Sequence, residues 1–304
     1  MAHLFNTIFR VETPEGSKFA LRIQRPDQSD VDVVHSEMLW LAALRREMNL
    51  SVPEPVCTSD GALLTVAGHE GVPELRICVL FRWMEGRFFD GSLTPAHLER
   101  VGALTALLHQ HAAQFTPPAG FTRGRVENLS CRDNGHADPF SDEALAYVRG
   151  LVAALRPAED VSLVEAALVK LRRTLGQLIQ EPEMVGLIHA DLHQENFLFY
   201  RGEVRAIDFD DCGYGHFLYD LAVTLREMRS RQDYPALREA LLRGYRRIRP
   251  LAAEYEEYLE SFFALRRLQL MIWGMEMREH PLWRKGWPAF VTRALQTLQA
   301  FVET

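Results

Sequence analysis

The spacing of hydrophobic and polar positions divides the chain into a strand-rich first part and a helical second part. Near the start, alternating residues on both sides of a Thr-Pro-Glu-Gly turn predict a β-hairpin. Apolar residues at helical spacing then predict one helix, and two short apolar runs predict further strands. These elements are expected at residues 7–12 and 18–24 for the hairpin, 33–46 for the helix, and 63–66 and 75–81 for the later strands.

The second part begins near Thr94 and Pro95, which suit the N-cap and the first position of a helix. The boundary between the two parts is therefore expected within residues 86–92. Further helices are predicted wherever apolar residues share one face. They are expected at 95–115, 142–155, 163–180, 234–247, 251–279 and 289–302.

One β-hairpin interrupts this helical part. An apolar run ending at Ile188 leads into a polar loop, and two short apolar runs follow at 196–200 and 204–207, separated by an Arg-Gly turn. After the hairpin, Gly213 and Gly215 are expected to let the chain double back as a loop.

Composition and charge narrow the class of protein. The chain has 304 residues, of which 47% are hydrophobic and 25% charged, as is ordinary for a soluble globular protein. Its net charge of -7 argues against a general nucleic-acid binder. We find neither a secretion signal nor an apolar stretch long enough for a membrane span, so a cytoplasmic protein is expected. The four cysteines, without paired metal-ligand spacing, are predicted to be reduced thiols: Cys57, Cys78, Cys131 and Cys212.

The interrupting hairpin carries oxygen-bearing side chains at both ends. Asp191 precedes Asn196 by five residues, and Asp208 stands at the far end of the returning strand. When the hairpin folds, the three side chains can converge. A carboxylate and an amide oxygen suit Mg²⁺, which also binds substrate phosphates. The remaining carboxylate can accept a hydroxyl proton, which is the division of roles in kinase phosphoryl transfer.

Three motifs in this region resemble those of the aminoglycoside phosphotransferase and choline kinase family, the small-molecule relatives of protein kinases, which includes homoserine kinase-like members. They are His-x-Asp-x-x-x-x-Asn at 189–196, Ile-Asp-Phe-Asp at 207–210 and Tyr-Asp-Leu-Ala at 219–222. The resemblance implies an α+β, bilobal protein-kinase-like fold. Residues 1–86 would form a nucleotide-binding lobe and residues 87–304 a mainly helical catalytic and substrate-binding lobe.

The same resemblance implies roles in the catalytic lobe. Asp191 would be the catalytic base, and Asn196 and Asp208 would hold the metal. His189 is expected to hold the loop by hydrogen bonds. His193 is expected either to approach phosphate or to support the turn.

Two further acids are expected to support the site. Asp210 is a candidate for contact with the metal or with a cationic substrate. Asp220 is expected to cap the helix that follows and to brace the catalytic loop. Acidic residues at 254–260 either line a site for amines or form a solvated helix face.

In the first lobe, the resemblance implies a phosphate-binding cation at Arg22, where many relatives have Lys. Arginine can contact phosphate bidentately, although an exposed strand cation is the alternative. Glu37 is either the ion-pair partner of this cation or a solvated helix residue. The carbonyl of Arg82 and the amide of Met84 would bind the adenine edge, unless this segment is an ordinary strand exit.

The resulting prediction is an ATP- and Mg²⁺-dependent phosphotransferase that acts on a hydroxyl of a small molecule, such as an aminoglycoside, amino alcohol, homoserine-like compound or sugar. Two alternatives stay open. One is a Ser/Thr protein kinase. The other is a non-catalytic, pseudokinase-like nucleotide-binding partner, suggested by Arg22 and by a short N-terminus, which indicates either a shorter family member or a missed upstream start. The sequence determines neither the acceptor, nor ATP against GTP, nor the oligomeric state.

Overall fold

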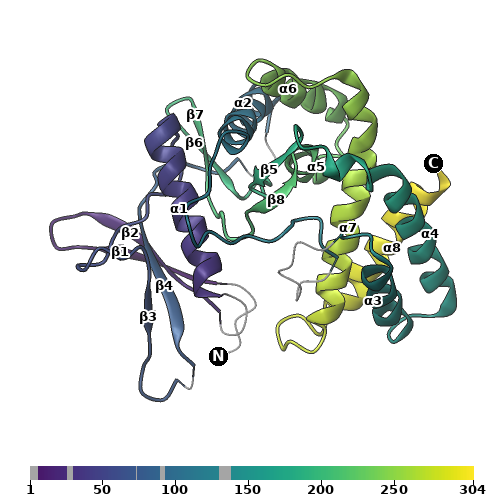
Figure 1. Ribbon diagram of the computed structural model, residues 1–304, viewed down its shortest axis with the longest axis horizontal. Helices are drawn as coiled ribbons and strands as arrows, with labels where there is room; N and C mark the ends of the chain where they lie inside the picture. Colours follow the sequence, from purple (N-terminus) through teal and green to yellow (C-terminus); the bar gives the residue numbers. More distant parts are fainter. Residues whose placement is uncertain (1–5, 26–29, 73, 90–92, 130–137) are drawn as a thin grey trace.

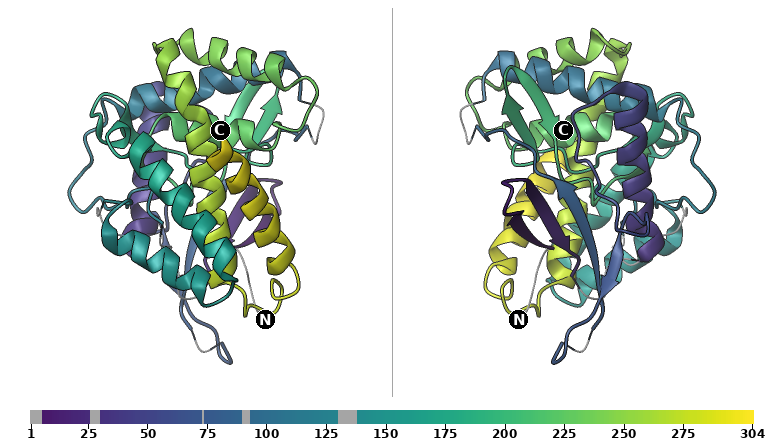
Figure 2. Two further views of the ribbon diagram at one scale, coloured as in Figure 1. Left: turned by 90° about the vertical axis from the view of Figure 1, so that its right-hand side faces the viewer. Right: turned by 90° about the vertical axis from the view of Figure 1, so that its left-hand side faces the viewer.

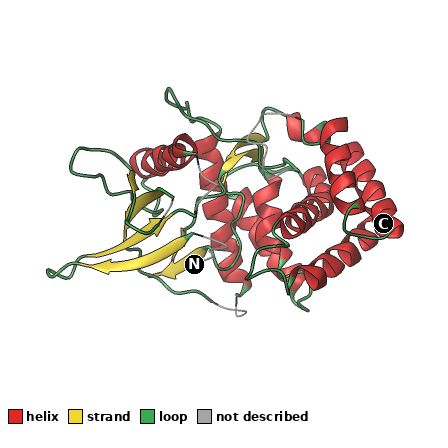
Figure 3. Cartoon of the chain, turned by 90° about the horizontal axis from the view of Figure 1, so that it is seen from below, coloured by secondary structure: helices red, strands yellow, loops and turns green. Residues whose placement is uncertain are grey.

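A small strand-rich part lies beside a larger helical part in the computed structural model of the protein (Figure 1). The structure describes residues 6–25, 30–72, 74–89, 93–129 and 138–304. Seen from below, the first strands gather at one end and most helices at the other (Figure 3). The division predicted from hydrophobic spacing is therefore present, whereas Cys131 falls outside the described residues.

The strand-rich part is a four-stranded antiparallel sheet in the order β1-β2-β4-β3, with one helix beside it. Its elements are β1 (Thr7–Glu12), β2 (Lys18–Ile23), α1 (Val31–Met48), β3 (Thr65–Ala67) and β4 (Arg76–Arg82). The turn between β1 and β2 is closed by a hydrogen bond from Gly16 N–H to the Thr13 carbonyl. The predicted hairpin and helix are confirmed.

The helical part packs its helices in pairs, with α2 against α6 and α7 against α8 (Figure 2). Its elements are α2 (Pro95–Ala112), α3 (Asp142–Ala153), α4 (Ala158–Leu175), α5 (Leu218–Arg226), α6 (Tyr234–Arg246), α7 (Leu259–Glu276) and α8 (Trp287–Glu303). Thr94 caps α2, as predicted. The helix predicted over 251–279 is wrong in its first turns, which form a 3-10 helix at Ala253–Tyr258.

Two glycines explain how closely α2 and α6 approach. A Cβ added at Gly102 would lie 2.0 Å from the Leu241 carbonyl oxygen, and one at Gly244 would lie 1.9 Å from the Glu99 carbonyl oxygen. Any side chain at either position would therefore push the two backbones apart. This close packing holds α2 against the core beneath the candidate site.

Two short sheets carry the loop between Ile188 and Phe197. β6 (Phe197–Tyr200) pairs with β7 (Glu203–Ala206), which confirms the predicted hairpin. β5 (Val185–Ile188) pairs with β8 (Gly213–His216). The prediction of a loop at the two glycines of β8 was wrong.

Close packing, rather than turn formation, accounts for the glycines of β8. A Cβ at Gly213 would lie 2.7 Å from the Gly124 carbonyl oxygen, and one at Gly215 would lie 2.5 Å from Cδ1 of Ile188. Neither glycine has a positive φ. Only a residue without a side chain lets the neighbouring backbone and β5 approach this strand.

Candidate active site

The buried carboxylate of Asp220 holds the start of the loop at residues 189–196. This carboxylate accepts hydrogen bonds from the backbone N–H groups of His189 (2.9 Å) and Ala190 (2.7 Å) and from Nε2 of His109 (3.1 Å). Burial opposes its ionisation, but the hydrogen bonds from His109 and from the His189 backbone outweigh burial and lower the pKa of Asp220. Ala190 has a φ of 70°, a strained conformation that these bonds stabilise.

The predicted cap at Asp220 is wrong. Helix α5 begins at Leu218, its N-cap is Phe217, and that cap has no side-chain hydrogen bond. Asp220 lies inside the first turn, and its side chain reaches the loop instead of the helix end. The buried His109 of α2 is the side-chain partner of this carboxylate.

His189 connects the loop to the segment after β7. Its Nε2–H donates to the Ile207 carbonyl (2.9 Å), and its Nδ1 accepts from the Asp191 N–H (3.3 Å). Burial lowers the pKa of His189, so the ring is neutral in this arrangement. The ring therefore fixes the start of the loop relative to the acids that follow Ile207.

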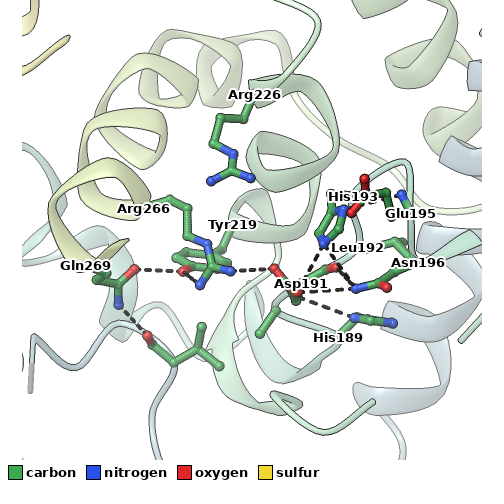
Figure 4. A network of polar contacts seen from close by, with 12 residues as sticks. His189, Asp191, Leu192, His193, Glu195, Asn196, Tyr219, Arg226, Arg266 and Gln269 are labelled. Atoms are coloured by element: carbon green, nitrogen blue, oxygen red, sulfur yellow. Dashed lines mark hydrogen bonds and ion pairs between the residues drawn. The ribbon is translucent and has the colours of Figure 1, made fainter. Parts of the chain in front are cut away.

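Asp191 is the centre of a polar network shown in Figure 4. Its Oδ2 lies 3.3 Å from His193 Nε2 and 3.2 Å from Asn196 Nδ2, and its Oδ1 accepts from Arg266. Burial opposes ionisation, but the hydrogen bond from His193 and the charge of Arg266 outweigh it and lower the pKa of Asp191 to about 2. Asp191 is therefore a carboxylate at neutral pH.

Asn196 and His193 support the loop around this carboxylate. Asn196 Nδ2 donates to the Asp191 carbonyl (2.8 Å), which leaves its Oδ1 without a hydrogen-bond partner among the described residues. The Glu195 N–H donates to His193 Nδ1 (3.3 Å), so the proton on Nε2 faces Asp191. Burial opposes protonation of His193, but Asp191 outweighs it and raises its pKa.

Arg266 was missed by sequence reasoning, although it lies next to Arg267 as a charged pair between apolar residues in the middle of α7. Its Nη1 donates to the Tyr219 hydroxyl (3.3 Å), which donates to Gln269 Oε1 (2.7 Å). Gln269 Nε2 in turn donates to the Val126 carbonyl (2.6 Å). The chain of contacts joins α5, α7 and the segment after α2 to Asp191 (Figure 4).

Three acids follow β7 and differ in their partners: Asp208, Asp210 and Asp211. Asp208 has a φ of 63°, is exposed, and makes no side-chain hydrogen bond or ion pair with the rest of the described chain. Asp210 accepts from Asn6 Nδ2 (2.7 Å) and Gln24 Nε2 (3.2 Å), so it joins this segment to the strand-rich part. Asp211 is exposed.

Both exposed acids carry raised pKa values. Desolvation by the surrounding protein, followed by the charge of Asp210, raises the pKa of Asp208. Desolvation and the charge of Asp191 raise the pKa of Asp211 to about 6. A cation bound among these acids would reverse the effect, since it favours the ionised carboxylates.

Arg22 and Glu37 form a buried bidentate ion pair, with N–O distances of 2.9 and 2.5 Å. Burial opposes the charge on Arg22, but the Glu37 carboxylate outweighs it and raises the arginine pKa. The guanidinium also lies 3.8 Å from Asp210 Oδ1. The alternatives of an exposed strand cation and a solvated glutamate are therefore wrong.

The segment after β4 differs from its neighbours in the partners of its backbone amides. The Arg82 N–H donates to the Glu54 carbonyl (2.9 Å), and the Trp83 N–H donates to the Lys18 carbonyl (3.1 Å). The Met84 N–H makes no backbone hydrogen bond to a described residue. Its position beyond the strand end leaves it free to bind a ligand.

Two of the acidic residues at 254–260, Glu256 and Glu260, pair with arginines. Glu256 accepts from Arg238 and Arg246, each at 2.5 Å, and Glu260 accepts from Arg229 at 2.5 Å. These contacts form ion pairs between helices at the surface. Glu254 and Glu257 of the same segment are exposed.

A cluster of metal-ligating side chains and a membrane-spanning helix are both absent from the part of the chain that the structure describes. Groups of three His, Cys, Asp or Glu side chains placed to hold a metal are absent from the described ranges. The described helices also include none with the length and apolar character that crossing a membrane requires.

Comparison with known proteins gives consistent matches. A model described as the phosphotransferase enzyme family matches residues 4–258. A homoserine kinase of Neisseria meningitidis serogroup B is 27% identical over 233 residues, which cover 74% of this chain and 67% of that protein. The structure of a microcompartment-associated aminopropanol kinase superposes with a TM-score of 0.77 at 30% identity, over 99% of this chain and 90% of that one. An amicoumacin kinase in complex with AMP-PNP, Ca²⁺ and Ami superposes with a TM-score of 0.78 at 20% identity, over 99% of this chain and 87% of that one.

Proposed function

The chain belongs to the phosphotransferase enzyme family, and on that premise we propose that it transfers the γ-phosphoryl group of ATP to a hydroxyl of a small molecule, with Asp191 as the base. The family resemblance and the protein-kinase-like fold inferred from the motifs are confirmed by these matches. The protein is a kinase for small-molecule hydroxyls, so the non-catalytic alternative is not retained.

The observation that carries the proposal is the ionised carboxylate of Asp191, held in a fixed loop with a pKa of about 2. Such a carboxylate is a weak base, but phosphoryl transfer passes through a loose transition state that needs little early deprotonation of the nucleophile. Asp191 would orient the hydroxyl and receive its proton as the new bond forms. The hydrogen bonds of His189 and Asp220 keep the loop in place.

The bonds and the proton of the proposed transfer can be accounted for step by step. The acceptor oxygen forms a bond to the γ-phosphorus while the bond from that phosphorus to the β–γ bridging oxygen breaks. The hydroxyl proton passes to Asp191, which later releases it to solvent. The products are ADP and a phosphate monoester.

The residues present fit a divalent cation, for which we propose Mg²⁺. Asn196 Oδ1 and the exposed Asp208 carboxylate are two oxygen donors without partners among the described residues. Two protein ligands suffice for Mg²⁺, which takes its remaining ligands from phosphates and water. When bound, the cation would neutralise charge on the phosphates.

The proposed nucleotide contacts lie in residues 1–86, the proposed nucleotide-binding lobe, with residues 87–304 as the catalytic lobe. Arg22, fixed by Glu37, would contact phosphate. The Arg82 carbonyl and the Met84 N–H would bind the adenine edge. Asp210 would support the approach of the two lobes through its contacts with Asn6 and Gln24.

The test is Mg²⁺-dependent release of ADP from ATP with a panel of homoserine, amino alcohols, sugars and aminoglycosides. We expect Asp191→Asn to lower kcat by roughly 100-fold or more while ATP binding is retained. Asp142→Asn, at a surface aspartate whose side chain is 91% exposed, serves as the control. Wild-type turnover by Asp191→Asn would rule out the assigned base.

A further inference from the structure

Four arginines lie near one another on two helices and the turn that follows one of them, and one of the four, Arg266, pairs with Asp191. Arg226 ends α5, Arg229 follows it, and two neighbouring arginines lie in α7. We call this set the arginine cluster, and it consists of Arg226, Arg229, Arg266 and Arg267. Figure 4 shows the guanidinium group of Arg226 pointing toward Arg266, whose own guanidinium group is turned to Asp191 and Tyr219.

The cluster has more positive charge than its partners neutralise. Arg226 pairs with Glu227 (3.0 Å), and Arg229 pairs with Glu260 (2.5 Å). Arg266 is paired with Asp191, the proposed base. Arg267 forms neither an ion pair nor a side-chain hydrogen bond with any residue in the described ranges, although its side chain is partly buried.

Like charges reinforce this imbalance. Burial and the charge of Arg266 lower the pKa of Arg226, while burial and the charges of Arg226 and Arg293 lower that of Arg267. Arginine cannot relieve the repulsion by losing its proton at physiological pH. A partly buried and uncompensated charge costs folding free energy, which an anion bound between the guanidinium groups would recover.

The two carboxylate oxygens of Asp191 face different partners. Its Oδ2 faces His193 and Asn196, on the side where a divalent cation is proposed, whereas its Oδ1 faces Arg266. Two acids near the cluster, Glu227 and Glu260, are already paired with arginines. Asp211 also acts on Arg266 by its charge. The unpaired Arg267 and the like charges of its neighbours therefore favour an anion on the side of Oδ1.

We propose that the arginine cluster binds an oxyanion of the phosphoryl acceptor, so that the acceptor is a small hydroxyl compound bearing a carboxylate or a phosphate. Arg226 and Arg267 hold the oxyanion, while Arg266 stays with Asp191. The inference rests on the proposed function, because it assumes that Asp191 meets the acceptor hydroxyl. Since Arg226 lies beside Arg266 and Asp191, the oxyanion and the reacting hydroxyl belong to one small molecule.

Guanidinium groups suit this role because their planar fork of donors matches both oxygens of a carboxylate or phosphate. A hydrogen bond to a charged group contributes enough that the loss of one arginine raises KM for the acceptor by roughly 10- to 100-fold. The effect is confined to the acceptor, since the proposed contacts for ATP lie on other elements.

The experiment compares acceptors that differ only in the anion. Homoserine, threonine and serine are each tested against the amino alcohol formed by removing the carboxylate, and glycerol phosphate is tested against glycerol. In the wild-type enzyme, we expect kcat/KM for the preferred anionic compound to exceed that of its counterpart by roughly 10-fold or more. The amino-acid pairs report a carboxylate and the glycerol pair reports a phosphate.

The same pairs are measured with Arg226→Gln and Arg267→Gln. Both substitutions are expected to raise KM for the anionic acceptor and to reduce its advantage, with KM for ATP unchanged. Arg267→Glu is expected to reverse the preference toward the amine. The matched control is Arg243→Gln, at a surface arginine of α6 that pairs with Glu99.

The outcomes separate this inference from the proposed function. Phosphorylation of any compound supports the kinase activity, but equal or better turnover of the uncharged or amine counterparts overturns the oxyanion site. A rise in KM for ATP in the arginine variants would also overturn it, because the cluster would then serve the nucleotide. If nothing is phosphorylated, the proposed function fails on this panel, and calorimetric binding of the same pairs decides the inference. Anionic compounds that bind the wild type and lose affinity in Arg267→Gln support it, and no binding of any anionic compound refutes it.

Discussion

Asp220 is the residue whose substitution tests most directly how the fold positions the proposed base. Its buried carboxylate accepts three hydrogen bonds, two of them from the backbone of the loop that carries Asp191. In Asp220→Asn the amide keeps the shape of the side chain but offers one accepting oxygen. His109 can adjust its tautomer to the new NH₂ group, since its other nitrogen faces the Tyr245 hydroxyl at 3.0 Å.

One backbone N–H of the loop is then left buried without an acceptor. Such a group costs about 1–3 kcal/mol, and the lost charge assistance on the remaining bond adds to this cost. We expect the free energy of unfolding to fall by about 2 kcal/mol and the melting temperature to fall by roughly 3–6 °C. Because Ala190 is held at a strained φ by the same carboxylate, Asp191 should also move, and kcat should fall by roughly 10-fold or more.

The way the stability difference between wild type and Asp220→Asn changes with pH distinguishes the loss of this carboxylate from a general packing defect. The pKa of Asp220 lies below its ordinary value of 3.8 in the folded protein. Its ionisation therefore contributes stability that is complete well above pH 3.8 and is lost as the pH falls through the folded pKa. The difference in melting temperature between wild type and Asp220→Asn should be constant near neutral pH and should narrow below pH 3.8.

The assay is thermal unfolding followed by circular dichroism across pH, together with kcat for the best acceptor. The control is Asp233→Asn, at a surface aspartate that pairs with Arg231 at 2.7 Å, which should change neither quantity because surface pairs contribute little. An Asp220→Asn protein with wild-type melting temperature and kcat would refute the assignment of the carboxylate as the support of the loop.

Three further predictions concern other parts of the molecule. Arg266→Gln should raise the pKa of Asp191 from about 2 toward its ordinary value, which a shift of the acid limb of the pH–rate profile to higher pH would reveal. Glu37→Gln should leave the buried Arg22 with only the more distant Asp210 carboxylate as a charged partner, and chemical denaturation should show a loss of about 3 kcal/mol. Gly244→Ala should force α2 and α6 apart and lower the melting temperature, whereas Gly150→Ala, in a helix with open space around it, should raise or preserve it.

Local pattern was sufficient for the elements and for the catalytic motifs. The period of apolar residues determined the first hairpin, the second hairpin and most helices, because the side chains that define a strand or a helix face are only two to four residues apart. The motifs at 189–196, 207–210 and 219–222 likewise carry the resemblance to the family. Each of these inferences depends on residues close together in the chain.

Only the tertiary structure decided which distant segments meet. Gly213 and Gly215 read as flexible in sequence, yet they form a strand because β5 and the Gly124 backbone pack against them. Asp220 was expected both to cap a helix and to brace the catalytic loop, and the tertiary structure retains only the second role. Arg266 lies 75 residues from Asp191 in the chain and pairs with it. Such contacts depend on how helices and strands close around the core, and the chain spacing of the residues involved contains no information on that closure.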